Sequence, residues 1–140
     1  MAEQRVIPMV SYEDVGRAAD WISEAFGFEE RQRFSDDDGT VSHATMVLDD
    51  AVVFLGWPGR GYHSPRRHAE ECEIARKMLE TPFVVDGVMV YVGDVDAHFE
   101  SARAAGATIL TEPEDNPAAG QRQYRVEDLE GHRWMFAQAL

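Results

Sequence analysis

The sequence predicts an α+β fold in which two β-α-β-β-β modules follow one another along the chain. A β-rich segment, an Asp-Val pair, a helical pattern and a closing glycine occur in this order at residues 7–28 and again at residues 88–107. Three further strand-like runs follow each helical pattern, and short acidic turns ending in glycine separate some of them. Together these repeats indicate a strongly curved mixed sheet made from two similar modules.

The two predicted helices have clear start and stop signals. Asp14 and Asp94 stand where an N-cap carboxylate would accept hydrogen bonds from first-turn amides. Gly27 and Gly106 stand where a left-handed C-cap is expected. Apolar residues recur at helical spacing between these signals. The predicted helices are residues 16–26 and 96–105.

Alternating and β-branched runs predict the remaining strands, and a segment without strand character separates the modules. This segment is rich in Gly, Pro, Arg and His, and its second part, residues 69–79, has the composition of a helix. We therefore expect a single domain over residues 1–140, with module one at 5–57, an insert at 58–86 and module two at 87–140. The strands predicted after the two helices are residues 29–34, 41–48, 52–56, 108–110, 121–127 and 133–137.

The composition argues against nucleic acid and membranes as partners. The chain has 140 residues and a formal net charge of −13, a balance that repels nucleic acid and anionic lipid. We found no apolar run long enough to span a membrane and no signal-peptide core, so we expect a cytoplasmic protein without membrane contact. Cys72 is the one cysteine, so no internal disulfide can form, and the neighbouring glutamates disfavour a reactive thiolate.

Four segments in the correct order carry a resemblance to a known family. Residues 124–136, Tyr-Arg-Val-Glu-Asp-Leu-Glu-Gly-His-Arg-Trp-Met-Phe, resemble the final hairpin of the glyoxalase, bleomycin-resistance and extradiol-dioxygenase superfamily, also called vicinal oxygen chelate. Residues 90–97 and 103–107 resemble its second βα unit, and residues 42–44 resemble its glyoxalase-like, PhnB-type subgroup. The resemblance implies a curved mixed sheet around a cleft, a small-molecule partner and a homodimer.

Metal-using members of this superfamily carry one ligand on each of four strands, facing the cleft. Carried over to this sequence, the four positions are Pro8, Phe54, Val88 and Met135. Proline, phenylalanine and valine side chains have no donor atom, and a methionine thioether suits soft copper rather than a hard divalent ion. The resemblance therefore predicts that this chain has no metal site and needs no cofactor.

The vacated positions predict a largely apolar cleft. By alternation, Trp134 and Phe136 point to the opposite face and pack beneath the helices. His43 lies in the middle of a strand, where it could bind a ligand or bond within the sheet, and Trp57 could close over a ligand. The residues that we predict to line the ligand cleft are His43, Phe54, Trp57, Met135, Arg133, Val88 and Pro8.

The insert contains a basic cluster in an otherwise acidic chain. Arg60, Arg66 and Arg67 could bind a carboxylate or a phosphate. Alternatively, they pair with the acids just downstream, Glu70, Glu71 and Glu73, or with acids across a dimer.

The sequence leaves three functions open. The favoured one is metal-independent binding of a small organic molecule, as in drug or metabolite sequestration. The second is a lyase, isomerase or dioxygenase with a non-standard metal site, or an enzyme that uses His43 for acid–base chemistry. The third is a structural or partner-binding module whose cleft is filled by its own side chains.

Overall fold

The computed structural model describes residues 4–81 and 87–140, which form two compact units divided between Ser64 and Pro65. Within these ranges the chain has eight strands and four helices. The division falls inside the predicted insert, so residues 58–64 belong to unit 1 and residues from Pro65 onward to unit 2. The end of that insert, residues 82–86, lies outside the described residues.

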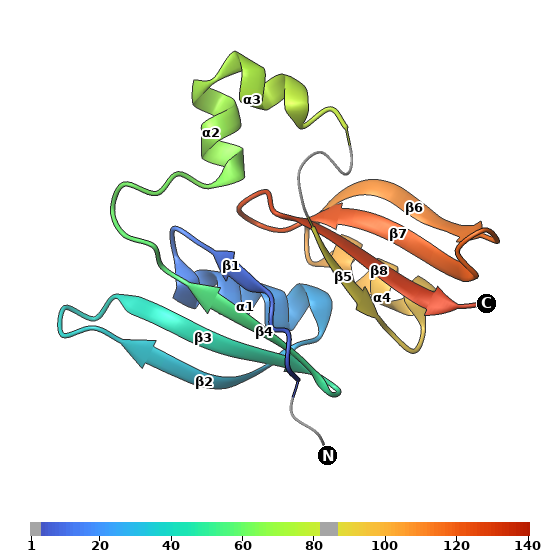
Figure 1. Cartoon of the computed structure of the whole chain (residues 1–140), viewed down its shortest axis with the longest axis horizontal. Helices are drawn as coiled ribbons and strands as arrows, with labels where there is room; N and C mark the ends of the chain where they lie inside the picture. Colours follow the sequence, from blue (N-terminus) through green and yellow to red (C-terminus); the bar gives the residue numbers. More distant parts are fainter. Residues whose placement is uncertain (1–3, 82–86) are drawn as a thin grey trace. The chain divides into compact units, whose positions relative to one another are not determined.

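Unit 1 contains the first β-α-β-β-β module in the predicted order (Figure 1). Its strands form one four-stranded sheet in the order β1-β4-β3-β2. The pairing of β1 with β4 is parallel and the other two pairings are antiparallel, so the sheet is mixed. The elements are β1 (Met9–Ser11), α1 (Val15–Phe26), β2 (Glu29–Ser35), β3 (Val41–Leu48) and β4 (Ala51–Gly56).

Unit 2 repeats the same topology after two short helices (Figure 1). Its sheet has the order β5-β8-β7-β6, with β5 parallel to β8. The strands β5, β8, β7 and β6 occupy the same places in this sheet as β1, β4, β3 and β2 in the first sheet. The predicted tandem repeat is therefore confirmed. The elements are α2 (Pro65–Glu71), α3 (Glu73–Met78), β5 (Val88–Tyr91), α4 (Val95–Ala104), β6 (Thr108–Asn116), β7 (Gln121–Glu127) and β8 (Arg133–Ala139).

The predicted N-caps are present in both modules. The Asp14 carboxylate accepts a hydrogen bond from the Arg17 N–H at 3.0 Å, and the Asp94 carboxylate accepts one from the Ala97 N–H at 3.0 Å. Gly27 caps the end of α1 with a φ of 77°, whereas the C-cap of α4 is Ala105, and Gly106, with a φ of 91°, follows it. These features fix where α1 and α4 begin and where α1 ends, as the sequence predicted.

Each long helix covers one face of the sheet of its own unit. In unit 1 the buried side of α1 packs against β2, β3 and β4. In unit 2, α4 packs against β6, β7 and β8, where Trp134 is 2% exposed and Phe136 is fully buried, as predicted. We call the face of each sheet that is turned away from α1 or α4 the distal face of that unit.

Two elements differ from the sequence prediction. The helix expected at residues 69–79 is two helices, because Cys72 between them has an extended backbone with φ −137° and ψ 118°. The strand β6 runs on to Asn116, well beyond the predicted end at residue 110. Pro113 lies within it, which an edge strand tolerates because a proline there has no ladder bond to lose on its solvent side.

The described helices are all short: the longest, α1, has 12 residues. None of them, over residues 4–81 and 87–140, has the length and apolar character that crossing a membrane requires.

Candidate ligand-binding site

The strand register decides which side chains share the distal face of unit 1. Thr45 pairs with Phe54, and His43 pairs with Gly56. Since paired residues point to the same side of a sheet, His43, Thr45 and Phe54 lie on one face. Their neighbours in the strands, such as Ala44 and Leu55, are fully buried on the α1 side.

Three rings form a cluster on this distal face. The centroids of His43 and Phe54 lie 4.9 Å apart in an edge-to-face arrangement with an interplanar angle of 77°. Phe34, which is paired with His43, has its centroid 5.6 Å from that of His43 and is 52% exposed. The His43 ring is held by a hydrogen bond between its Nε2 and the Thr45 Oγ1 at 2.8 Å. The result is a fixed, partly exposed aromatic surface.

The residues predicted to face the cleft beside β4 and β8, Pro8 and Val88, were each wrong by one residue. In unit 1 the residue paired with Phe54 is Met9, so Pro8 is not the neighbour of Phe54 on the distal face. In unit 2 Val88 pairs with Trp134 and therefore points to the α4 side, whereas Met89 pairs with Met135. The sequence count from the Asp-Val pairs could not detect this shift, because register depends on the partner strand.

Met135 lies on the distal face of unit 2, but much of this face is polar. The β7 residues that point the same way are Gln121, Gln123, Arg125 and Glu127, as shown by their pairing with the odd-numbered residues of β8. The expectation of an apolar surface is therefore wrong for unit 2. Alternation along residues 121–127 contained the signal, because every second residue there is polar and points away from buried Tyr124 and Val126.

Arg133 is engaged inside unit 2. Its guanidinium pairs with Glu127 at 2.7 Å and donates to the backbone oxygens of Thr81 at 3.0 Å and Leu79 at 2.7 Å. The Arg133 side chain is 6% exposed. These contacts tie the segment that follows α3 to the end of β7, which is a structural role for Arg133.

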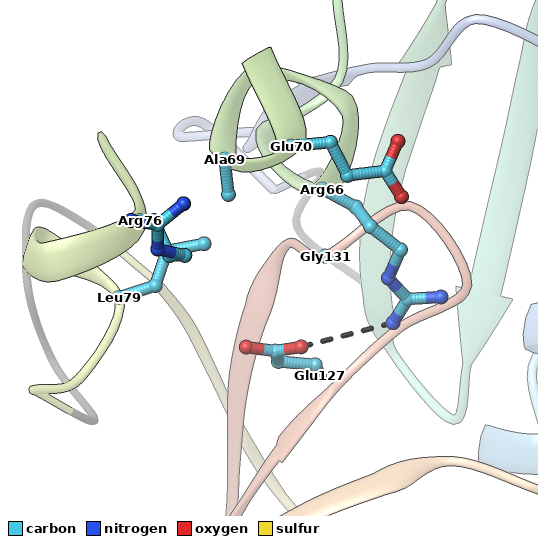
Figure 2. Close-up of a pocket in the computed structure, with 7 residues that line it drawn as sticks. All are labelled: Arg66, Ala69, Glu70, Arg76, Leu79, Glu127 and Gly131. Carbon is cyan, nitrogen blue, oxygen red and sulfur yellow. Dashed lines mark ion pairs between the residues drawn. The ribbon is translucent and has the colours of Figure 1, made fainter. Parts of the chain in front are cut away.

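A pocket of about 250 Å³ lies in unit 2, between the two short helices and the turn that joins β7 to β8 (Figure 2). Arg66 and Glu127 form an ion pair at 3.7 Å across one side of it. Arg66 also donates to the backbone oxygens of Leu129 at 2.8 Å and Asp128 at 3.1 Å. The pocket is lined by Arg66, Ala69, Glu70, Arg76, Leu79, Glu127 and Gly131.

The contacts of Arg66 show how this one member of the basic cluster is paired. The partners of its guanidinium are Glu127 and two backbone oxygens, and not the acids of residues 70–73 that we considered. The donors of Arg66 are thus directed at the final hairpin, where they help to hold α2 in place.

Trp57 follows β4 directly, and its backbone N–H donates to the Ser42 oxygen at 3.1 Å. The segment after it is anchored by Tyr62, whose hydroxyl donates to the Ser11 oxygen at 3.0 Å. Closure of Trp57 over a ligand stays a prediction.

Within residues 4–81 and 87–140, no group of three or more His, Cys, Asp or Glu side chains could hold a metal ion. A divalent ion with nitrogen and oxygen ligands needs several such groups to converge. The distal face of unit 1 carries the aromatic rings of Phe34, His43 and Phe54, and that of unit 2 carries thioethers, amides and the charged groups of Arg125 and Glu127.

Two β-α-β-β-β modules with one helix on each sheet define the class of glyoxalase-like proteins. The family comparison agrees: residues 7–136 match the Glyoxalase/Bleomycin resistance protein/Dioxygenase superfamily, and the chain belongs to this superfamily. The finer assignment to the PhnB-type subgroup stays a prediction.

Solved structures share this fold. TioX from Micromonospora sp. ML1 is 33% identical, with a TM-score of 0.71 and coverage of 98% of this chain and 99% of that one. TnmS3, an antibiotic binding protein from Streptomyces sp. CB03234, is 19% identical, with a TM-score of 0.67 and coverage of 100% and 99%. Mb0911c from Mycobacterium bovis is 29% identical in sequence, over 99% of this chain and 85% of that protein.

Proposed function

We propose that this protein binds a small organic molecule without a metal ion and so sequesters a drug or a metabolite. The observation that carries the proposal is the ring cluster of Phe34, His43 and Phe54 on the distal face of unit 1. The superfamily membership and the likeness to an antibiotic binding protein support it.

The ring cluster has the properties of a recognition surface. Leaving a phenylalanine half exposed loses the favourable free energy that burial would give, about 1.5–3 kcal/mol for a full side chain. A ligand ring that packs on Phe34 and Phe54 would recover part of it and add about 0.5–1.5 kcal/mol for each aromatic pair. The hydrogen bond to Thr45 already fixes the His43 ring, so little ordering is needed on binding.

The ligand contacts that we propose at the ring cluster are His43, Phe54 and Trp57, all in unit 1. Met135, on the distal face of unit 2, stays a separate prediction of a ligand contact within that unit. The corrected neighbours support metal independence, because Met9 and Met89 no more resemble ligands for hard divalent ions than Pro8 and Val88 did. The net charge of −13 would favour a cationic over an anionic ligand. We propose that the protein is a homodimer in the cytoplasm.

A thermal-shift screen against antibiotics and metabolites tests the proposal, followed by titration of each hit. Phe54→Leu and His43→Ala should each weaken the binding of a hit, Phe54→Leu by about three- to tenfold through the lost ring contact. The matched control is His68→Ala on exposed α2, which should bind as the unchanged protein does.

Two outcomes would count against the proposal. If no compound raises the melting temperature, or if both variants at the ring cluster bind every hit normally, ligand binding at this surface is wrong. Metal analysis of the purified protein tests the second part: stoichiometric Zn, Ni, Mn or Fe would contradict metal independence.

Acid–base catalysis by His43, the alternative from the sequence, finds less support. Among the described residues, the contacts of its ring are Thr45, Phe34 and Phe54, and none of these is a carboxylate that could orient or charge the imidazole. The geometry favours a binding role.

A further inference from the structure

A second surface lies on the distal face of unit 2, where three strands place three residues side by side. Ala137 on β8 pairs with Tyr91 on β5 and with Gln123 on β7. A small side chain, itself fully buried, thus lies between a phenol and an amide at this level of the face.

The Tyr91 side chain reaches across β8 at this level. Its hydroxyl donates a hydrogen bond to Gln121 Oε1 at 2.9 Å. Because β5 and β7 lie on opposite sides of β8, the Tyr91 side chain must cross β8 to make this bond. The β8 residues at this level are Ala137 and Ala139, whose small side chains give the ring room to cross.

The Tyr91 ring is therefore fixed at its tip while 63% of the residue remains exposed. An exposed tyrosine is ordinarily free to change rotamer, and holding it has an entropic cost. Here the hydrogen bond to Gln121 holds it, so one flat face is already oriented for stacking.

The hydrogen bonds continue in one direction along β7. Gln121 Nε2 donates to Gln123 Oε1 at 2.7 Å, and both glutamines are only 5% exposed. Each group in the series Tyr91, Gln121, Gln123 donates to the next. The series ends at the Gln123 Nε2 group, which has no acceptor among the described residues.

This terminal amide is not fully buried. Among the described side-chain nitrogens and oxygens that are fully buried, the one without a hydrogen-bond partner is Arg133 Nε. Gln123 Nε2 is therefore not sealed off, although the residue around it is more than nine-tenths buried. Burial restricts the access of this N–H donor to water. It therefore gains more free energy from a hydrogen bond to a ligand than a fully solvated donor would.

We propose that this surface binds a planar aromatic compound that bears a carbonyl group. The ring stacks on Tyr91, and the carbonyl oxygen accepts a hydrogen bond from Gln123 Nε2. Met89 and Met135, paired on the next level of the same face, supply adaptable apolar contacts at the ring edge. The inference rests on the proposed small-molecule function and names the chemical class of the ligand and a residue that selects it.

Coumarin and 2-thiocoumarin form a suitable pair of probes, because they share a planar shape while the thiocarbonyl is the weaker acceptor. We expect the unchanged protein to bind coumarin about three- to tenfold more tightly. In ¹⁵N-labelled protein, coumarin should also shift the Gln123 side-chain amide signals more than 2-thiocoumarin does.

The variants form a thermodynamic cycle with these probes. Gln123→Leu should weaken coumarin binding about three- to tenfold and remove the preference over 2-thiocoumarin. Gln123→Glu keeps the size but replaces the donor with an acceptor, and it should weaken coumarin binding at least as much. Tyr91→Phe keeps the stacking face and should retain the preference, whereas Tyr91→Ala should weaken both probes equally.

The inference is overturned if coumarin fails to bind at millimolar concentration. It is also overturned if the Gln123→Leu variant still binds coumarin more tightly than 2-thiocoumarin. A misfolded variant would be recognised by loss of dispersion in its amide spectrum, and the amide shifts in the unchanged protein then decide. The proposed function is tested separately: it fails if the compound screen gives no hit whose binding depends on His43 or Phe54.

Discussion

Asp128 shows how one buried carboxylate can organise the turn that joins β7 to β8. Its Oδ1 accepts hydrogen bonds from the backbone N–H groups of Glu130 and His132, each at 3.0 Å. Its Oδ2 accepts one from the Trp134 indole Nε1 at 3.0 Å, and the residue is 1% exposed. The turn and the largest core side chain of unit 2 are thus fixed by the same group.

We predict that Asp128→Ala lowers the free energy of unfolding by about 2–4 kcal/mol, because it leaves several buried donors without an acceptor. Urea denaturation followed by fluorescence measures this change. Asp50→Ala, at an exposed position in the turn between β3 and β4, is the control and should change stability by less than about 0.5 kcal/mol. Equal effects of both substitutions would show that the Asp128 contacts contribute little.

At the scale of single residues, the sequence predicted the strands that carry the proposed contacts better than it predicted where their side chains point. His43 and Phe54 were chosen by strand position, and the register places both on the distal face. Pro8 and Val88 were misplaced by one residue, since their register is set by pairing with β4 and β8. No count along the chain reveals that pairing.

At the scale of elements, Gly131 joins α2 to the final hairpin. Its φ of 91° lies in the region that favours glycine, and an added Cβ would come within 2.9 Å of the Arg66 backbone nitrogen. That nitrogen donates to the Glu130 oxygen at 3.0 Å, which brings the backbones of α2 and the turn together. Two separate costs therefore oppose a side chain at this position.

Gly120 provides the matched control, because its φ of 69° is also positive but an added Cβ would meet nothing within 4 Å. We predict that Gly120→Ala lowers the free energy of unfolding by about 1 kcal/mol through backbone strain alone. Gly131→Ala should lower it by about 2–3 kcal/mol, since the contact with α2 is added.

Hydrogen exchange separates the two glycine variants further. Amides of α2 should exchange faster in Gly131→Ala and at the normal rate in Gly120→Ala, because only Gly131 lies against α2. If the two variants lose equal stability and α2 stays protected in both, the close approach at Gly131 is unimportant.

The elements themselves were predicted best where local signals are strong. Asp14 and Asp94 as caps and Gly27 as a terminator fixed the two long helices before any packing was known. The break at Cys72 and the extension of β6 past Pro113 were missed. The extension of β6 rests on its pairing with β7, from Glu114 to Asn116, although a proline ordinarily argues against a strand. The helix-forming residues around Cys72 carry no local signal of a break.

At the scale of the whole chain, the repeat predicted the topology because each module must bury a helix against its own sheet. The polar distal face of unit 2 did not follow from this reasoning. We had expected an apolar surface from the vacated ligand positions, whereas alternation along residues 121–127 places two glutamines there. The fold thus constrains where a site can form, and in our proposal the side chains on the distal faces decide what it recognises.

The net charge is a property of the whole molecule with consequences for stability. The 26 acidic residues exceed the 13 basic ones, so 13 negative charges would remain even if every basic group were paired. Three consecutive acids, Asp36, Asp37 and Asp38, concentrate this charge in the turn between β2 and β3. Unfolding moves such charges apart and is therefore favoured by their repulsion.

We predict that the free energy of unfolding rises by about 1 kcal/mol between roughly 20 and 300 mM NaCl, as the screening length shortens below the spacing of exposed charges. Asp37→Lys changes the net charge from −13 to −11 and should raise stability at low salt while flattening the salt dependence. Urea denaturation at each salt concentration measures both effects. Stability that falls with salt would mean that local pairs such as Arg122 with Asp96, at 2.9 Å, outweigh the general repulsion.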